Sequence, residues 1–540
     1  KGTEADLDSL DELGRMIRDM SLCGLGQTAP NPVLTTMRHF RHEFEDHIRA
    51  NRCRAGVCEN LALSPCENSC PLHMNIPRFL QLYKEDRLEE AFESVVMDNP
   101  LPASTGRVCQ HPCEDRCRRT NLDSAINIRD VHRYIADSIY ASDRYPAMIE
   151  RILARKLAPT GKKVGIVGAG PAGLACAFYL SLLGHEATIY DSNAAAGGML
   201  RYALPEYRLP EHVLDKEIEL IERLGVKFVF NTTVGRDLSL DELEAQYDAV
   251  FLAMGTWKEA SARLPGIELR GVMPALGFLE AVSKGEKVNL GKRVAVIGGG
   301  NSAIDSARTA LRMGAEVTVI YRRERKDMPA IKEEVEAAEA EGANFVYLAA
   351  PHRIVGTTDG RVKAIEVVKT RLGEFDTSGR RKPVPTEEIQ VFKCDTVILA
   401  IGERVDDALP RASGLKLTDS GTIAADRYTL QTSRPKVYAG GDVISGAANV
   451  VNAMGYGKKA ARLIDQHLME DKRIAKLSRK WEYDQTPPAS PSKEPRQLPG
   501  QLDPLERVKS FAEVTTGLTA LQVLHEAERC LRCDVKANGD

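Results

Sequence analysis

The feature that most constrains the fold is a segment that occurs twice in the chain. Residues 163–192 read KVGIVGAGPAGLACAFYLSLLGHEATIYDS, and residues 292–323 read KRVAVIGGGNSAIDSARTALRMGAEVTVIYRR. Each copy has a short apolar strand, a glycine-rich turn, a helix with apolar spacing and a second β-branched strand. This βαβ context is what gives a G-x-G-x-x-G pattern its meaning. The sequence therefore predicts an α/β protein with two Rossmann-like nucleotide-binding domains.

The small residues of each copy have separate roles. The first glycine permits the tight turn, the second lets backbone amides reach a pyrophosphate, and the third position lets the helix pack close to the strand. The predicted dinucleotide contacts are Gly168, Gly170, Pro171, Ala172 and Gly173 in the first copy and Gly298, Gly300, Asn301, Ser302 and Ala303 in the second.

The ends of the two second strands indicate which nucleotide each copy binds. Asp191 ends the strand of the first copy, where a carboxylate accepts hydrogen bonds from ribose hydroxyls, as in FAD. In the second copy Tyr321 is followed by Arg322 and Arg323, and two guanidinium groups suit the 2′-phosphate of NADPH. A solvated charged surface would give the same arginine pattern. We predict FAD in the first domain and NADPH in the second.

Composition limits the class of partner. The formal charge is -3 with 28% charged residues, so the chain has no basic field for nucleic acid. No apolar run approaches the roughly 20 residues that span a bilayer, and the first residues are acidic rather than those of a signal peptide. We expect a cytoplasmic chain of three or four domains, without nucleic-acid binding or membrane insertion.

Four further stretches carry a family resemblance: AAGGMLRYALPEYRLP, YRRERKDMPA, LGEFDTSGRRKPVP and AGGD. They resemble the small subunit of NADPH-dependent glutamate synthase, the flavin module of dihydropyrimidine dehydrogenase and the large subunit of NADH-dependent ferredoxin:NADP oxidoreductase. The resemblance implies flavin-based chemistry without a catalytic side chain. It also implies FAD contacts at Gly198, Leu200, Gly255, Gly441, Asp442 and Ala453, with Gly402 on the NADPH side.

Disulfide reductases share this two-domain frame, but they carry a redox cysteine pair just after the first nucleotide motif. No such pair lies between Gly173 and Cys394. A dithiol substrate is therefore not expected. Cys176 and Cys394, in apolar helix and strand patterns, are predicted core residues.

Ten of the twelve cysteines lie in the first 117 or the last 11 positions. In a reducing compartment such grouping indicates metal or cluster ligands. The spacings are C-x3-C-P from residue 66, C-x3-C-x3-C from residue 109 and C-x2-C from residue 530. Iron–sulfur clusters use such short spacings, and zinc accepts four thiolates equally well.

The resemblance implies two 4Fe–4S clusters, bound by an R-C-L-x-C pair, the C-x3-C-P pair, the cysteine trio and one other side chain. Relatives have R-C-L-x-C just before C-x3-C-P, whereas here its lead-in E-A-x-R-C-L-x-C lies at residues 526–533, beyond a proline-rich linker. We therefore predict that the iron–sulfur domain is permuted. The implied ligands are Cys66, Cys117, Cys530 and Cys533 for cluster 1, and Cys70, Cys109, Cys113 and His132 for cluster 2, although a lone helical histidine is more often a surface or capping residue.

The front segment, from MSLCGLG to RAGVC, resembles the C-terminal iron–sulfur region of the NADH-binding flavoprotein subunit of complex I and bifurcating hydrogenases. The residue matching Cys23 is there the fourth ligand of a cluster whose other ligands lie upstream, so we expect a truncated chain. We expect Cys53 and Cys58, with a histidine such as His47, to form a zinc knuckle or, together with Cys23, a further cluster. Plain unligated thiols are the alternative for these three cysteines.

We expect an NADPH-dependent FAD and iron–sulfur oxidoreductase that serves a second flavoprotein and ferredoxin-type subunits in an electron-bifurcating transhydrogenase. The alternatives are a glutamate synthase small subunit, a hydrogenase or formate dehydrogenase diaphorase-type subunit, and an assembly subunit without ligands. The expected segments are 1–58 (helical front), 59–150 (iron–sulfur), 160–290 and 406–472 (FAD), 291–405 (NADPH), 473–505 (linker) and 506–540 (C-terminal completion).

Overall fold

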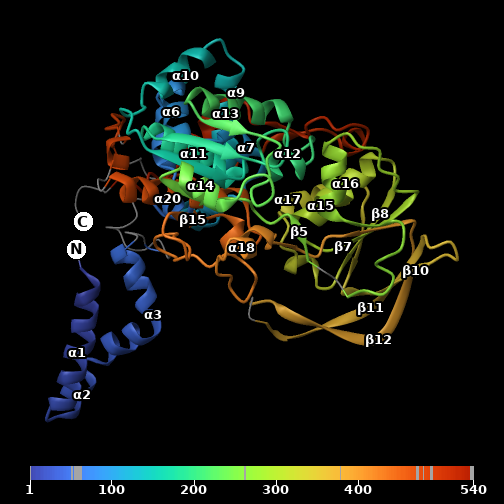
Figure 1. The fold of residues 1–540 in the computed structure, drawn as a ribbon, viewed down its shortest axis with the longest axis horizontal. Helices are drawn as coiled ribbons and strands as arrows, with labels where there is room; N and C mark the ends of the chain where they lie inside the picture. The colour runs from blue at the N-terminus through green and yellow to red at the C-terminus, as the bar shows by residue number, and fades with distance from the viewer. Residues whose placement is uncertain are drawn as a thin grey trace.

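Two parallel five-stranded sheets organise the computed structural model of the chain (Figure 1). The structure describes residues 2–49, 53, 64–260, 263–376, 379–469, 473–477, 479–486 and 491–535. The first sheet has the order β15 (Val437–Ala439), β4 (Ala249–Leu252), β1 (Lys163–Val167), β2 (Glu186–Tyr190) and β3 (Lys227–Val229). The second has the order β6 (Val272–Pro274), β13 (Thr396–Leu399), β7 (Arg293–Ile297), β8 (Glu316–Tyr321) and β9 (Asn344–Tyr347).

Each predicted βαβ unit lies at the centre of one sheet, which confirms the predicted fold class. β1 pairs with β2 in parallel, with Val167 opposite Tyr190, and β7 pairs with β8 in parallel, with Ile297 opposite Ile320. Their interior strand residues are almost fully buried, as expected for parallel strands covered on both faces. The crossover helices are α11 (Pro171–Leu182) and α16 (Asn301–Arg312).

The two nucleotide domains are joined by a pair of short strands, and further helices surround their sheets. The strands β5 (Lys258–Glu259) and β14 (Glu403–Arg404) pair where the chain passes between the domains. The helices are α12 (Met199–Tyr202), α13 (Glu211–Arg223), α14 (Leu240–Gln246), α15 (Ala275–Ser283), α17 (Lys332–Ala340), α18 (Ala408–Ala412), α19 (Asp442–Ser445) and α20 (Val450–Met469), with 3-10 turns Arg325–Asp327 and Arg473–Leu477.

A separate antiparallel sheet extends from the second nucleotide domain. Its strands are β10 (Ala349–Gly356), β11 (Val362–Phe375) and β12 (Arg381–Lys393), and β11 and β12 form a long ribbon at the edge of the molecule (Figure 1). At the opposite end an arm of three helices projects from the body: α1 (Glu4–Met20), α2 (Gly24–Thr28) and α3 (Asn31–Arg49).

A helical domain packs on the first nucleotide domain. Residues such as Phe79, Phe92 and Ile135 join Leu174 and Ile464 in one continuous hydrophobic core. The domain contains α4 (Pro65–Ser69), α5 (Ile76–Lys84), α6 (Leu88–Asp98), α7 (Pro102–Val108), α8 (Pro112–Asp115), the 3-10 turn Arg118–Asn121, α9 (Ile128–Tyr140) and α10 (Tyr145–Leu153).

The last described segment returns to this helical domain. It contains β16 (Gly500–Gln501), α21 (Pro504–Arg507), β17 (Thr515–Gly517) and α22 (Ala520–Glu528), and α22 packs against α5 and α9. Val523 and Ala527 bury their side chains in the shared core. Among the helices that the structure describes, none combines the length and apolar character needed to cross a membrane.

Candidate functional site

A cleft opens at the carboxyl ends of the strands of the first sheet, beside the N-terminus of α11. The predicted FAD contacts that line it are Gly168, Gly170, Pro171, Ala172, Asp191, Gly198, Leu200, Gly255, Asp442 and Ala453. The two other predicted contacts lie behind this lining. A Cβ atom on Gly173 would lie 1.9 Å from the carbonyl oxygen of Gly168, so only glycine lets α11 pack this closely. Gly441 adopts φ +76°, a left-handed conformation that favours glycine.

Two carboxylates face this cleft in different states. Asp191 Oδ2 accepts a hydrogen bond from the Ala169 amide at 2.7 Å, and Oδ1 accepts one from Asn193 at 2.8 Å. Asp442 Oδ1 is buried without a hydrogen-bond partner, and burial raises the pKa of Asp442 to about 6. A buried acceptor without a donor fits a hydroxyl-bearing ligand such as the ribityl chain of FAD.

Helix α20 presents its N-terminus to the same cleft. It begins at Val450, and both Val450 and Ala453 line the cleft. Asn449 precedes the helix, and its Oδ1 accepts a hydrogen bond from the Asn452 amide at 2.9 Å and caps the first turn. The partial positive charge at this end of the helix suits the electron-rich edge of a flavin.

The second nucleotide motif faces the cleft from the other domain. Asn301 and Ser302 line it at the start of α16. Gly298 adopts φ +146°, and a Cβ atom there would lie 2.2 Å from a backbone oxygen. Around Gly300 and Gly402, by contrast, a Cβ atom would meet no other atom within 4 Å, which leaves backbone open to a pyrophosphate. Ala303 is fully buried in the core of this domain.

The two arginines predicted for the 2′-phosphate differ in the structure. Arg322 is exposed at the end of β8. Arg323 is only 3% exposed, and its guanidinium donates to Asp376 at 2.7 Å and to the Arg381 carbonyl at 2.8 Å. Arg323 thus ties β8 to the ribbon, whereas Arg322 remains exposed to solvent. The sequence pattern could not separate these roles.

Four cysteines from opposite ends of the chain line one cavity, which we call cavity 1: Cys66, Cys117, Cys530 and Cys533. The rest of its lining is mostly apolar and includes Ile76 and Ile128. Burial raises the pKa of the Cys66 thiol well above its usual value, and the other three thiols raise it further. Four thiolates in such surroundings would need a cation, and cluster iron would supply it with release of the thiol protons.

A second cavity, cavity 2, is lined by the other predicted set of Cys70, Cys109, Cys113 and His132. His132 Nδ1 lies 3.2 Å from the Pro102 carbonyl oxygen. Because a carbonyl only accepts, Nδ1 carries the proton and Nε2 keeps its lone pair. Burial lowers the pKa of His132 to about 4, so the ring is neutral at pH 7. A neutral imidazole oriented by a backbone carbonyl is typical of a metal ligand.

Three family models match the chain. Residues 162–457 match the pyridine nucleotide-disulphide oxidoreductases, residues 35–144 match the dihydropyrimidine dehydrogenase domain II with its 4Fe-4S cluster, and residues 1–47 match the NADH-ubiquinone oxidoreductase-F iron-sulfur binding region. The first match covers more than half of the chain. The chain belongs to the pyridine nucleotide-disulphide oxidoreductase family. It is an NAD(P)H-dependent flavoprotein oxidoreductase that uses FAD, NADPH and iron–sulfur clusters.

Several relatives of this oxidoreductase extend along most of the chain. NADPH-Fe(3+) oxidoreductase subunit beta of Geobacter sulfurreducens is 36% identical over 99% of this chain and 84% of that protein. NADP(+)-dependent formate dehydrogenase subunit beta of Moorella thermoacetica is 37% identical over 99% of this chain and 85% of that protein. The glutamate synthase [NADPH] small chain of Escherichia coli is 37% identical over 76% of this chain and 90% of that protein. This match confirms the predicted family resemblance.

A solved structure supports the fold of the nucleotide domains. Mycobacterium tuberculosis FprA in complex with NADPH superimposes with a TM-score of 0.50 at 20% identity, over 59% of this chain and 87% of that chain.

The residues proposed for zinc in this oxidoreductase are not gathered in the described part of the chain. There, no group of three or more His, Cys, Asp or Glu side chains could hold a single metal ion. Cys23 is exposed and caps α2, where its Sγ accepts from the Gly26 amide at 3.4 Å. His47 lies in α3 and Cys53 is buried, whereas Cys58 lies outside the described residues.

The cleft also contains polar groups that sequence reasoning missed. Arg208 donates to both carboxylate oxygens of Asp305 at 2.8 Å, which links the first domain to α16. Glu403 accepts a hydrogen bond from Ser302 Oγ at 3.0 Å. Arg208 lies in the stretch AAGGMLRYALPEYRLP, where the motif carried the family resemblance but gave no sign of this contact.

Cleft and cavities lie in a row. Val108 and Gln110, on either side of Cys109, line the nucleotide cleft. Val450 lines the cleft and the next residue, Val451, lines cavity 2. Two isoleucines, Ile76 and Ile128, line both cavity 2 and cavity 1. The order is therefore nucleotide cleft, cavity 2, cavity 1.

Proposed function

We propose that this oxidoreductase is the NADPH-reactive electron-transfer subunit of a larger redox complex, with one 4Fe–4S cluster in each cavity. When bound, the flavin exchanges hydride with NADPH, and the clusters carry electrons one at a time. The observation that carries the proposal is the row of cavities: sequence neighbours such as Val450 and Val451 line the cleft and cavity 2, and Ile76 and Ile128 line both cavity 2 and cavity 1.

The protein's own residues supply placement rather than acid–base chemistry. Arg208 and Asp305 fix the two nucleotide domains against each other, and Arg322 stands where a 2′-phosphate would be selected. The apolar side chains of Ile76 and Ile128 form part of the wall of both cysteine cavities. An apolar wall favours transfer within the row over loss to solvent.

The complex that we propose is an electron-bifurcating transhydrogenase that couples NADPH, NADH and ferredoxin through a second flavoprotein and ferredoxin-type subunits. The Geobacter and Moorella relatives, each matching 99% of the chain, are named as beta subunits, which supports a role within an assembly. The match of residues 1–47 to an NADH-ubiquinone oxidoreductase-F region supports contact with NADH-linked redox partners. A hydrogenase or formate dehydrogenase complex would use the subunit in the same way.

A glutamate synthase small subunit is the second candidate, favoured by the 37% identity to the Escherichia coli small chain. Anaerobic purification of the intact complex distinguishes the candidates. We expect roughly eight iron atoms per chain, as for two clusters of this type, together with a second flavoprotein and ferredoxin-type subunits. A glutamine-cleaving partner would instead establish glutamate synthase, and an iron content near zero would contradict the cluster assignment.

A further inference from the structure

The lead-in to the terminal cysteine pair contains two charged residues that the cofactor sites do not use. Glu526 lies in α22 and Arg529 caps it, directly before Cys530 of cavity 1. Both side chains are 0% exposed. Burying charges is costly unless they are paired and hydrogen-bonded, so these two residues indicate a specific structural task.

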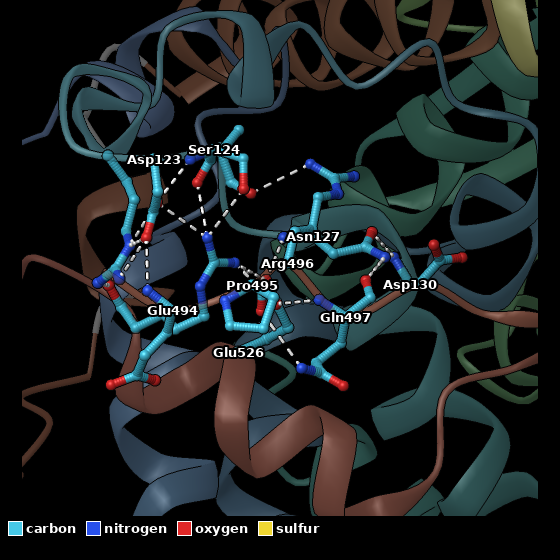
Figure 2. Close-up of polar contacts among 12 residues, drawn as sticks. Asp123, Ser124, Asn127, Asp130, Glu494, Pro495, Arg496, Gln497 and Glu526 are labelled. Carbon is cyan, nitrogen blue, oxygen red and sulfur yellow. Dashed lines mark hydrogen bonds and ion pairs between the residues drawn. The ribbon is translucent and has the colours of Figure 1, made fainter. Parts of the chain in front are cut away.

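Glu526 joins three segments that are distant in sequence (Figure 2). Its Oε2 accepts a hydrogen bond from the Asn127 amide at 2.7 Å, at the start of α9. Its Oε1 accepts one from the Gln497 amide, also at 2.7 Å, in the returning linker. Arg529 Nη1 donates to Oε1 at 2.7 Å and to Oε2 at 2.9 Å, so the Glu526 carboxylate also has a charged partner at the end of its own helix.

Arg529 extends the contacts to the loop that follows Cys117. Its Nη2 donates to Asp123 Oδ1 at 3.0 Å and to the Ser124 carbonyl at 2.8 Å. The Arg529 carbonyl in turn accepts from Arg119 Nη1 at 2.5 Å. Arg119 lines cavity 1, so the network reaches the cavity wall.

The linker adds its own bonds on the same face. The Glu494 amide donates to Asp123 Oδ2 at 3.0 Å, and Asn127 Nδ2 donates to the Gln497 carbonyl at 3.1 Å. Arg496 Nη2 donates to Glu114 Oε2 at 2.6 Å. None of these hydrogen bonds uses a cysteine sulfur. The network can therefore form without iron.

We propose that Glu526 and Arg529 are positioning residues that dock the returning segment before iron binds. Docking brings Cys530 and Cys533 to Cys66 and Cys117 and so completes cavity 1 as a four-thiol site. The proposal rests on the assignment of cavity 1 to a cluster. It adds that protein contacts, rather than the cluster, hold the segment in place.

Hydrogen–deuterium exchange on the full-length protein tests this directly, with iron content and FAD absorbance measured on the same samples. In Cys530→Ser we expect the loss of about four of roughly eight iron atoms, while the amides of Asn127 and Gln497 keep their wild-type protection. In Glu526→Ala we expect faster exchange at both amides and the same loss of iron, although all four thiols remain. FAD should stay bound in both variants.

Glu528→Ala is the matched control, because Glu528 is an exposed carboxylate on the same helix. It should retain wild-type iron and exchange. If Glu526→Ala is recovered without FAD, Glu526→Gln replaces it, since the amide keeps the side-chain shape and one acceptor but loses the charge that pairs with Arg529.

Two results would overturn the proposal. Loss of amide protection in Cys530→Ser would mean that the cluster itself holds the segment. Full iron retention in Glu526→Ala or Glu526→Gln would mean that the network does not position the thiols. A wild-type protein without cluster iron would instead contradict the proposed function. The hydrogen–deuterium exchange rates of Glu526→Ala would still measure docking independently in that case.

Discussion

The nucleotide cleft and the two cysteine cavities lie side by side but are built differently. The cleft uses the backbone of tight turns, as at Gly168 and Gly298, and the N-termini of helices. The cavities use individual side chains from separate segments, and cavity 1 joins Cys66 to Cys533. A backbone site distributes its contacts over many amides, whereas a cluster site loses a ligand with each thiol. Single substitutions should therefore have larger effects in the cavities than in the cleft.

The largest effect is expected from Cys530→Ser. The variant should lose about four iron atoms, by cluster type, and at least a hundredfold of its NADPH-driven reduction of a single-electron acceptor. NADPH should still bleach the flavin, because the cleft is intact. Iron analysis and anaerobic absorbance spectra measure both quantities. Full iron content in this variant would show that the terminal segment is not part of the site.

His132 offers the next test, since it distinguishes cavity 2 from cavity 1. His132→Ala should abolish or alter the EPR signal of one cluster, because the neutral ring is the only non-thiol ligand predicted. His132→Cys should restore the iron but lower the midpoint potential, since an anionic thiolate stabilises the oxidised cluster more than imidazole does. Unchanged spectra in both variants would assign His132 to packing alone.

Substitutions of Arg322 and Arg323 should have different effects, one on the selectivity for NADPH over NADH and the other on the stability of the fold. Arg322→Ala should weaken NADPH binding roughly 10- to 100-fold, the value of a charge-assisted hydrogen bond of about 1.5–3 kcal/mol, and leave NADH binding almost unchanged. Arg323→Ala should mainly lower the thermal midpoint, because it breaks the buried contact with Asp376. Equal losses for both nucleotides in Arg322→Ala would count against the 2′-phosphate assignment.

The smallest effect concerns Asp442 and pH. Burial raises its pKa from 3.8 to about 6, so the FAD-free folded state binds this proton more tightly than the unfolded chain does. The stability of FAD-free protein should fall as pH rises from about 4 to about 6. Above pH 6, Asp442→Asn should be the more stable protein by on the order of 3 kcal/mol, at about 1.4 kcal/mol per pKa unit. Urea unfolding at pH 4 and pH 7.5 measures this difference, and parallel pH profiles for the two proteins would contradict it.

What the sequence could predict follows the same division. The two βαβ units lie within short continuous stretches, so periodicity and glycine spacing were enough to predict both nucleotide-binding domains and the lining residues of the two glycine motifs. The other predicted lining residues, such as Gly198 and Asp442, came from the family resemblance. The cysteine sets came from family resemblance, because no local pattern links residue 66 to residue 533. Arg208, Glu403 and the different environments of Arg322 and Arg323 depend on packing between distant segments, which spacing does not encode.

In the proposed electron path, the cleft, cavity 2 and cavity 1 act in series. The most direct test compares Cys113→Ser, which alters cavity 2, with Cys530→Ser, which alters cavity 1, in anaerobic stopped-flow mixing with NADPH and a single-electron acceptor. We expect flavin bleaching at the wild-type rate in both variants and acceptor reduction in neither. Acceptor reduction at the wild-type rate in Cys113→Ser would contradict it, because electrons would then leave the cleft without passing cavity 2.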